Sequence, residues 1–332
     1  MRGGLQMAVA SALCVVLLIG AGGYAFDKLT PWPMVLRLRH AFHKGDVAAA
    51  ATQAPFVPAG VSEQLGLRYA PGDPHALMDV FAPEGAGRPL PAVIWVHGGG
   101  FVSGSRATLR NYLKILAAKG FVTIGVDYAL APAGRYPEPV REANAALAYV
   151  RTHARALHVD PDRLFLAGDS AGAQIVAQAA LGLADPAYAR ALGITPGAPL
   201  GSIRGLVLFC GLYDPSAVDP QSDLAWSARP EMWAYTGAPH LSDPRLRAMA
   251  IAPHVTAAFP PVFLSAGNGD PLQVQSEGLA KALQARGVVV DTLFFPPGRT
   301  PPLGHEYQFQ FGDPAARLAL ERATAFLAAH AP

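Results

Sequence analysis

Ser170 has the local sequence of a nucleophile at a tight turn. It stands in "GDSAGA" between Gly168 and Gly172, after the apolar run "LFLAG" and before an alanine-rich run. This pattern predicts a buried strand, a sharp turn and a helix, with the serine at the turn. Two glycines would let the strand and the helix cross closely and leave the serine oxygen accessible. The alternative is an ordinary glycine-rich turn, so the rest of the sequence must supply the partners of the serine.

A serine hydroxyl is a weak nucleophile near neutral pH and needs a base to take its proton. His305, in "PLGHEYQF", follows a predicted strand ending near Phe295 and precedes the last predicted helix. The other histidines that we considered lie in or just after a helix, or near the chain ends. By itself His305 could be a loop histidine with a structural hydrogen bond. Together with Ser170 in this order of elements, we interpret it as the catalytic base.

Two aspartates could orient the histidine. Asp270, in "SAGNGDPL", follows a short apolar strand, whereas Asp214, in "GLYDP", follows the preceding strand. We favour Asp270 because the order Ser170, Asp270, His305 is the order of serine, acid and histidine in α/β hydrolases. Asp270 could instead cap the helix that follows it, and Asp214 stays the alternative acid.

The glycine run "VHGGGF" could stabilise the oxyanion of a tetrahedral intermediate. It follows a predicted strand, and its three glycines, residues 98–100, leave the backbone N–H groups uncovered by side chains. Each donor of this kind contributes about 3 kcal/mol in the transition state. A phosphate-binding loop is the competing interpretation, but the run lacks the ending "GK[ST]" that such a loop requires.

From about Leu65 to its end, the chain resembles the hormone-sensitive-lipase-like carboxylesterases of the α/β-hydrolase fold. The resemblance rests on "HGGGF", "VDYALAP" followed by "YP", "GDSAGA", "GDPL" and "GHEYQF", in that order. It implies an oxyanion hole made by the backbone N–H groups of Gly99, Gly100 and Ala171. The residues that would support these motifs are His97, Gly98, Gly168, Asp169 and Gly172. Ala173 departs from the family pattern, because many members have a third glycine there.

The elements that must position these residues alternate along the chain. Apolar segments that predict strands are "HALMDVFAP", "PAVIWVHGGG", "FVTIGVDYA", "RLFLAGDS", "RGLVLFCGLYD", "PPVFLSAGNGD" and "VVVDTLFFPP". Predicted helices between and after them cover 107–119, 138–157, 171–183, 273–286 and 314–329. The alternation predicts an α/β fold, the α/β-hydrolase fold, with a mainly parallel sheet flanked by helices on both faces and a small cap. We assign this hydrolase domain to residues 61–332.

An insertion at about residues 215–255 interrupts the alternation with proline, aspartate and aromatic residues. We expect it to lie at the carboxyl ends of the strands as a lid over the substrate. The alternative is a surface excursion whose aromatic residues pack locally. The residues that we assign to the substrate pocket are Phe101, Trp226, Trp233 and Tyr235.

The N-terminal segment, residues 1–26, contains an uncharged apolar run from residue 3 to 26 that is long enough to cross a bilayer as a helix. We interpret it as an uncleaved membrane anchor, with a cleaved signal peptide or a buried helix as alternatives. Residues 27–60 predict an amphipathic segment beside the membrane or within the cap. The flanking charges favour a cytoplasmic domain, but a short tail before a large domain is typical of exported proteins, and we expect the catalytic domain outside the cytoplasm.

The charge, the cysteines and the absence of metal motifs in the sequence limit the partners and cofactors that we expect. The net charge is +2, and no basic run carries interleaved aromatic residues, so nothing indicates a nucleic-acid partner. The two cysteines, Cys14 and Cys210, lie in the apolar leader and in a predicted strand, which makes a disulfide within the domain improbable. No metal-binding motif is present, and we expect neither a metal nor a cofactor.

These observations predict a serine esterase that hydrolyses carboxylic esters through an acyl-enzyme. An amidase, a formamidase or a thioesterase could use the same residues. A noncatalytic receptor on this fold is the alternative from another class of protein, and it would be expected to lack one of the three catalytic residues. The sequence does not define the acyl group, the alcohol or the oligomeric state.

Overall fold

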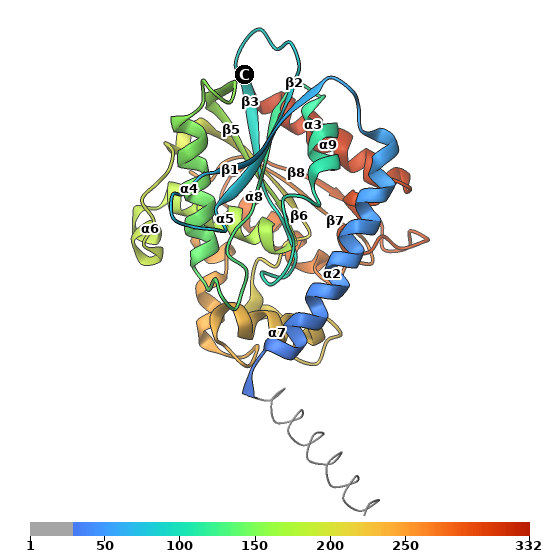
Figure 1. Cartoon of the computed structure of the whole chain (residues 1–332). Helices are drawn as coiled ribbons and strands as arrows, with labels where there is room; N and C mark the ends of the chain where they lie inside the picture. The colour runs from blue at the N-terminus through green and yellow to red at the C-terminus, as the bar shows by residue number, and fades with distance from the viewer. Residues whose placement is uncertain (1–28) are drawn as a thin grey trace, which may run out of the picture.

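The structure is a computed structural model and describes residues 29–332 (Figure 1). The predicted membrane segment, residues 1–26, lies outside the described residues. Within residues 29–332, no helix combines the length and the apolar character that crossing a bilayer requires.

One eight-stranded sheet forms the centre of the molecule, in the order β1-β2-β4-β3-β5-β6-β7-β8. Strands β1 and β2 pair antiparallel, as do β2 and β4, and all other neighbours pair parallel. The bounds are β1 Val61–Arg68, β2 Leu77–Pro83, β3 Leu90–Val96, β4 Val122–Val126, β5 Val159–Asp169, β6 Ile203–Phe209, β7 Val262–Ala266 and β8 Val290–Phe294. The prediction of a mainly parallel sheet is therefore confirmed. Strand β1 is additional to the predicted strands, because its residues are mostly exposed and carry no apolar alternation.

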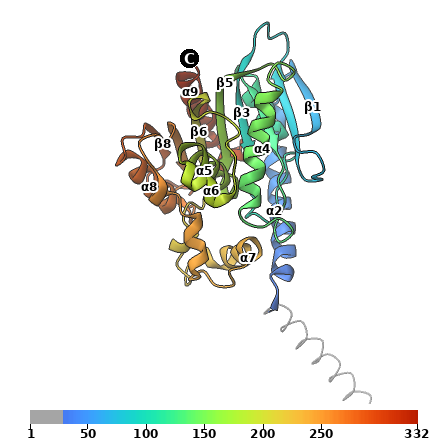
Figure 2. The same ribbon diagram turned by 90° about the vertical axis from the view of Figure 1, so that its left-hand side faces the viewer.

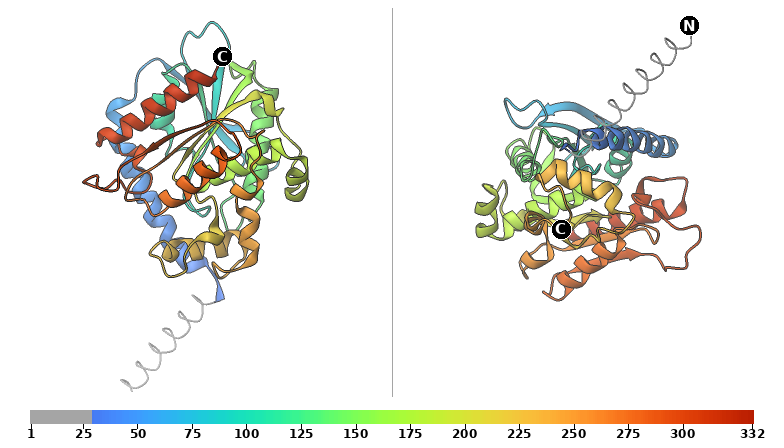
Figure 3. Two further views of the ribbon diagram at one scale, coloured as in Figure 1. Left: turned by 180° about the vertical axis from the view of Figure 1, so that it is seen from behind. Right: turned by 90° about the horizontal axis from the view of Figure 1, so that it is seen from below.

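Helices cover both faces of the sheet (Figures 2 and 3). Successive residues of β3 point to opposite faces, so Val93 and Trp95 pack with α3 and α9 whereas Ile94 and Val96 pack with α4, α5 and α8. The helix bounds are α3 Arg110–Ala117, α4 Glu138–Thr152, α5 Ser170–Ala184, α6 Pro186–Leu192, α8 Gln273–Gln284 and α9 Pro314–His330. Helix α4 ends before the predicted residue 157, because 153–158 form turns and His158 has a positive φ.

Helix α2, Trp32–Gln53, runs along the domain to the end of the molecule where α7, Ala225–Thr236, lies (Figure 1). The two helices are in contact. Arg39 fixes α2 to the domain, since its Nε donates to the Val102 carbonyl at 2.7 Å and its Nη2 to the Ala131 carbonyl at 3.0 Å. The segment predicted as amphipathic therefore contains a long helix that packs on the hydrolase domain.

The insertion consists of α7 and three short 3₁₀ helices, η3 Pro215–Ala217, η4 Pro244–Met249 and η5 Ala252–His254. It follows β6 and precedes β7, as predicted. Together with α2 it covers the carboxyl ends of the parallel strands, where the catalytic candidates lie.

Candidate active site

Ser170 lies at the turn between β5 and α5, with φ = 50°. This left-handed conformation is unusual for a residue with a side chain and marks local strain. The turn is possible because its flanking glycines allow close crossing. A Cβ on Gly168 would lie 2.5 Å from the backbone carbon of Gly172, and a Cβ on Gly172 would overlap the Val96 carbonyl. The backbone thus holds the serine hydroxyl at the end of the strand.

Two hydrogen bonds connect the three residues predicted to form a catalytic triad. Ser170 Oγ lies 2.9 Å from His305 Nε2, and His305 Nδ1 lies 3.0 Å from Asp270 Oδ2. In the reactive tautomer the serine donates to Nε2 and Nδ1–H donates to the carboxylate. Asp270 Oδ1 also accepts the Leu272 N–H at 2.8 Å, so this carboxylate caps the following turn as well as holding the histidine.

Asp214, the alternative acid, makes only local contacts with its side chain. Its Oδ1 accepts the Ser216 N–H at 3.0 Å and the Ser216 hydroxyl at 2.6 Å, at the start of η3. The structure therefore brings Asp270, and not Asp214, to His305.

The Asp270 carboxylate stabilises the imidazolium that His305 forms when it accepts a proton. Burial lowers the pKa of His305, but the Asp270 carboxylate raises it through its charge and its hydrogen bond, and the net shift is upward. Burial raises the pKa of the Cys210 thiol to about 11, so this thiol is neutral near pH 7. Within residues 29–332, these three residues are the set whose atoms could hold a metal ion. Two of these possible ligand atoms, His305 Nδ1 and Asp270 Oδ2, already form a hydrogen bond with each other.

The glycine loop predicted to bind the oxyanion, residues 98–100 and here called the oxyanion loop, follows β3. Gly98 N–H donates to Asp169 Oδ2 at 2.8 Å and is therefore occupied. Gly99 and Gly100 have φ values of +101° and +61°, and no hydrogen bond from their N–H groups to the described chain is found. Ala171 is in the first turn of α5, where backbone N–H groups have no acceptor within the helix. Three donors are thus available beside Ser170.

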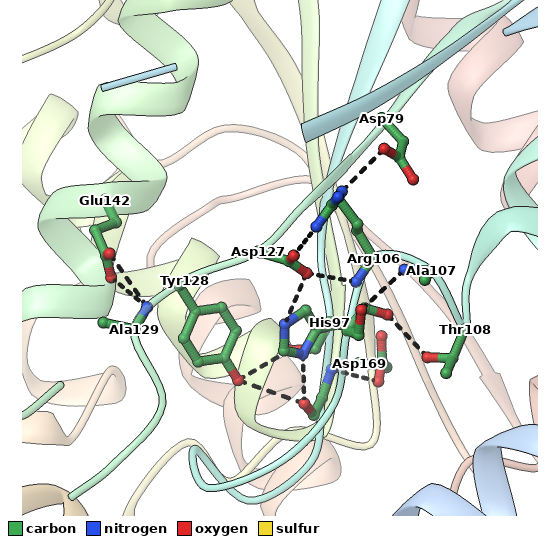
Figure 4. Close-up of polar contacts among 12 residues, drawn as sticks. Asp79, His97, Arg106, Ala107, Thr108, Asp127, Tyr128, Ala129, Glu142 and Asp169 are labelled. Carbon is green, nitrogen blue, oxygen red and sulfur yellow. Dashed lines mark hydrogen bonds and ion pairs between the residues drawn. The ribbon is translucent and has the colours of Figure 1, made fainter. Parts of the chain in front are cut away.

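His97 supports this loop (Figure 4). Its side chain is buried, its Nδ1 donates to the Gly98 carbonyl at 2.8 Å, and its ring stacks on Tyr128 with centroids 4.4 Å apart. The Tyr128 hydroxyl donates to the His97 carbonyl at 3.2 Å. Burial lowers the pKa of His97. The neutral imidazole therefore has a structural position under the loop, with its Nε2 3.7 Å from Oδ1 of Asp127, which in turn pairs with Arg106.

A cavity of about 360 Å³ lies over Ser170 and His305. It is lined by the oxyanion loop, by residues of α2 and by Leu224, Ser227 and Glu231 around α7. The volume is at the small end of the range of about 300–1,000 Å³ for ligand pockets.

None of the four residues assigned to the substrate pocket from the sequence lines this cavity. Phe101 and Tyr235 are buried and stack on each other, with ring centroids 4.1 Å apart and an angle of 9° between the rings. Trp226 is 62% exposed on the outer surface of the cap. Trp233 does not line the cavity either. The assignment was wrong because neighbouring residues face the cavity instead: Ser227 and Glu231 on α7, and Gly100 before Phe101.

Three cavity carboxylates were not predicted. Asp46 comes from α2, Glu231 from α7, and Glu306 follows the catalytic histidine with φ = 57°. Burial and the neighbouring Asp169 raise the pKa of Glu306, and these two carboxyl groups share a hydrogen bond. The sequence could have indicated Glu306, because it directly follows His305. Asp46 lies in the segment predicted as amphipathic and Glu231 lies in the insertion, and no motif marked either of them.

Comparisons with known proteins support the family and the fold. Residues 93–298 match a family model described as alpha/beta hydrolase fold. An acetyl esterase from Salmonella enteritidis is 27% identical over 274 residues, which cover 77% of each chain. Esterase B from Lactobacillus rhamnosis (HN001) superposes with a TM-score of 0.75 at 24% identity, over 90% of this chain and 96% of the other. A fungal esterase from Rhizomucor miehei gives a TM-score of 0.68 at 26% identity, over 85% and 88%.

The fold and the site define a hydrolase with a serine at the turn between strand and helix. The chain belongs to the α/β-hydrolase fold family, in its hormone-sensitive-lipase-like branch. It is an enzyme of the carboxylic ester hydrolase class.

Proposed function

We propose that this enzyme hydrolyses small carboxylic esters through an acyl-enzyme on Ser170. The observation that carries the proposal is the pair of hydrogen bonds from Ser170 to His305 and from His305 to Asp270, beneath a cavity.

In the first half of the reaction, Ser170 Oγ attacks the ester carbonyl carbon and its proton passes to His305 Nε2. Asp270 stabilises the resulting imidazolium. The negative oxygen of the tetrahedral intermediate accepts hydrogen bonds from the N–H groups of Gly99, Gly100 and Ala171. The carbonyl then re-forms, the bond to the alcohol oxygen breaks, and His305 gives its proton to the leaving alcohol.

In the second half, water attacks the acyl-enzyme. His305 takes a proton from the water, the same three N–H groups bind the second oxyanion, and the acid leaves as Ser170 regains its proton. A short acyl group fits the small cavity, and an acetyl group is what the name of the Salmonella relative specifies.

Hydrolysis of p-nitrophenyl esters of two to eight carbons, with p-nitroacetanilide as the amide, tests this function. We expect the highest kcat/KM with the shortest esters, little amide cleavage, and no turnover by Ser170→Ala. The matched control is Ser242→Ala, since Ser242 is exposed in the cap, and it should retain turnover. Full activity of Ser170→Ala would contradict the mechanism, and faster cleavage of the amide would identify an amidase.

We also propose that residues 1–26 associate the protein with a membrane, with the catalytic domain outside the cytoplasm. Support comes from the uncharged run in that segment and from Leu29, Trp32 and Leu36, whose apolar side chains are exposed at the start of α2. The full chain should then sediment with membranes, and a chain beginning at Asp27 should stay in the supernatant. Added protease should digest the domain in spheroplasts. A full chain that stays in the supernatant uncleaved would contradict the proposal.

A further inference from the structure

Glu231 is a buried carboxylate that faces the substrate cavity without a partner. Its residue is only 7% exposed, and it lines the cavity together with Ser170 and His305. A Cβ on Gly100 would lie 2.5 Å from Glu231 Cδ, so the carboxyl group packs directly on the oxyanion loop. Among the side-chain hydrogen bonds of residues 29–332, none involves this carboxyl group. Such a buried group without a partner is costly unless a ligand supplies one.

Other hydrogen-bond acceptors line the same cavity. Asp46 enters it from α2, and Glu306 enters it from the loop after β8. Gln53 also lines it, with its amide nitrogen donating to the Phe309 carbonyl at 2.9 Å while its Oε1 is buried without a donor. No lysine or arginine lines the cavity in the part of the chain that the structure describes. The cavity lining therefore carries more carboxyl groups than basic side chains.

An ammonium group has the complementary chemistry, because it carries a positive charge and N–H donors but no acceptor. Burial raises the pKa of Glu231 to about 8 and that of Asp46 to about 6. A bound cation would offset this cost, since an opposite charge nearby favours the ionised carboxylate.

We propose that Glu231, assisted by Asp46, binds a cationic amine carried by the ester substrate. The inference rests on the proposed function, since it names the substrate class of the same site. Glu231 lies beside the oxyanion loop, so the amine belongs a few bonds from the scissile carbonyl, in a substrate small enough for the cavity. Anionic esters are disfavoured by the same carboxylates.

Two esters of nearly identical shape test the proposal. In 2-(dimethylamino)ethyl acetate a protonated nitrogen takes the place of the branching CH of 3-methylbutyl acetate. At pH 7 we expect the wild type to favour the amine ester about tenfold or more in kcat/KM, the range of a charge-assisted hydrogen bond. In Glu231→Gln, which keeps the size but loses the charge, the ratio should fall toward one. Because the readout is a ratio, a general loss of activity or of folded protein cancels.

Glu321→Gln is the matched control, since Glu321 is exposed on α9, outside the cavity, and its ratio should equal that of the wild type. Equal kcat/KM for the two esters in the wild type would overturn the cation site while leaving the esterase function standing. An unchanged ratio in Glu231→Gln would also overturn it. Failure to hydrolyse either ester, or full activity of Ser170→Ala, would overturn the proposed function and this inference with it.

Discussion

Trp95 donates its indole N–H to Asp169 Oδ1 at 2.7 Å, and both residues are almost completely buried. The other oxygen of the same carboxylate accepts the Gly98 N–H at 2.8 Å. Asp169 immediately precedes Ser170. One side chain therefore connects the carboxyl end of β3, the oxyanion loop and the turn that carries Ser170.

Asp169→Asn should weaken both the fold and catalysis. An asparagine offers one acceptor oxygen to two donors, so either Trp95 or Gly98 would face an amide NH₂ and lose its partner. We expect the free energy of unfolding to fall by about 1–3 kcal/mol, the cost of a buried donor without an acceptor, together with a lower kcat. Urea denaturation and ester hydrolysis measure the two effects. Wild-type values for both would show that this carboxylate does not hold the loop.

Replacing each candidate acid with asparagine should show which of the two orients His305. Asp270→Asn should lower kcat by about 10⁴-fold, because an asparagine favours the wrong imidazole tautomer. Asp214→Asn is the matched control, and it should leave kcat near the wild-type value because its contacts are confined to the start of η3. If Asp214→Asn proves the more damaging change, the acid is assigned incorrectly.

Glu306 should make the protein less stable at alkaline pH. Burial and Asp169 raise the pKa of Glu306 in the folded protein, and the nearby Asp270 acts in the same direction, whereas His305 opposes it. Its favourable contribution is therefore complete below the unfolded pKa of about 4.3 and is lost as the pH rises through the raised value. Glu306→Gln stays neutral, so its stability relative to the wild type should increase from pH 5 to pH 9.

Urea denaturation of both proteins across this pH range checks the prediction for Glu306. Glu321→Gln serves as the control, because that side chain is exposed. A difference between Glu306→Gln and the wild type that does not change with pH would rule out this titration.

Helix α2 should be necessary for activity, because it forms part of the cavity wall and is held by Arg39. A chain beginning at Asp27 retains this helix and should hydrolyse short esters. In that chain, Arg39→Met should raise KM more than it lowers kcat, since it loosens the wall and leaves the catalytic hydrogen bonds in place. If the two constants are unchanged, α2 has no part in substrate binding.

Much of the site was predictable because it follows the strands. Ser170, Asp270 and His305 lie at or in the loop after the carboxyl end of a predicted strand, and the carboxyl ends of parallel strands meet at one edge of the sheet. The order of the elements therefore placed these side chains together without knowledge of the packing. The parallel part of the sheet was predictable for the same reason, since its buried strands are continuous apolar runs.

The cavity wall could not be predicted in this way. Which residues of α7 face the substrate depends on how that helix packs. Its short apolar pattern is equally compatible with Tyr235 or Glu231 facing the cavity. The contribution of α2 depends on a contact between segments far apart in the sequence, with Asp46 meeting the loop of Glu306. The exposed strand β1 has no apolar alternation to reveal it.

Covalent labelling with an organophosphorus ester tests the central claim most directly, because such reagents phosphorylate the activated serine and stop turnover. The account predicts one adduct per chain, found by peptide mass spectrometry on Ser170, formed in proportion to the loss of activity, and absent from Ser170→Ala. Complete inactivation with the adduct on any other residue, or esterase activity that persists when Ser170 is fully labelled, would contradict it.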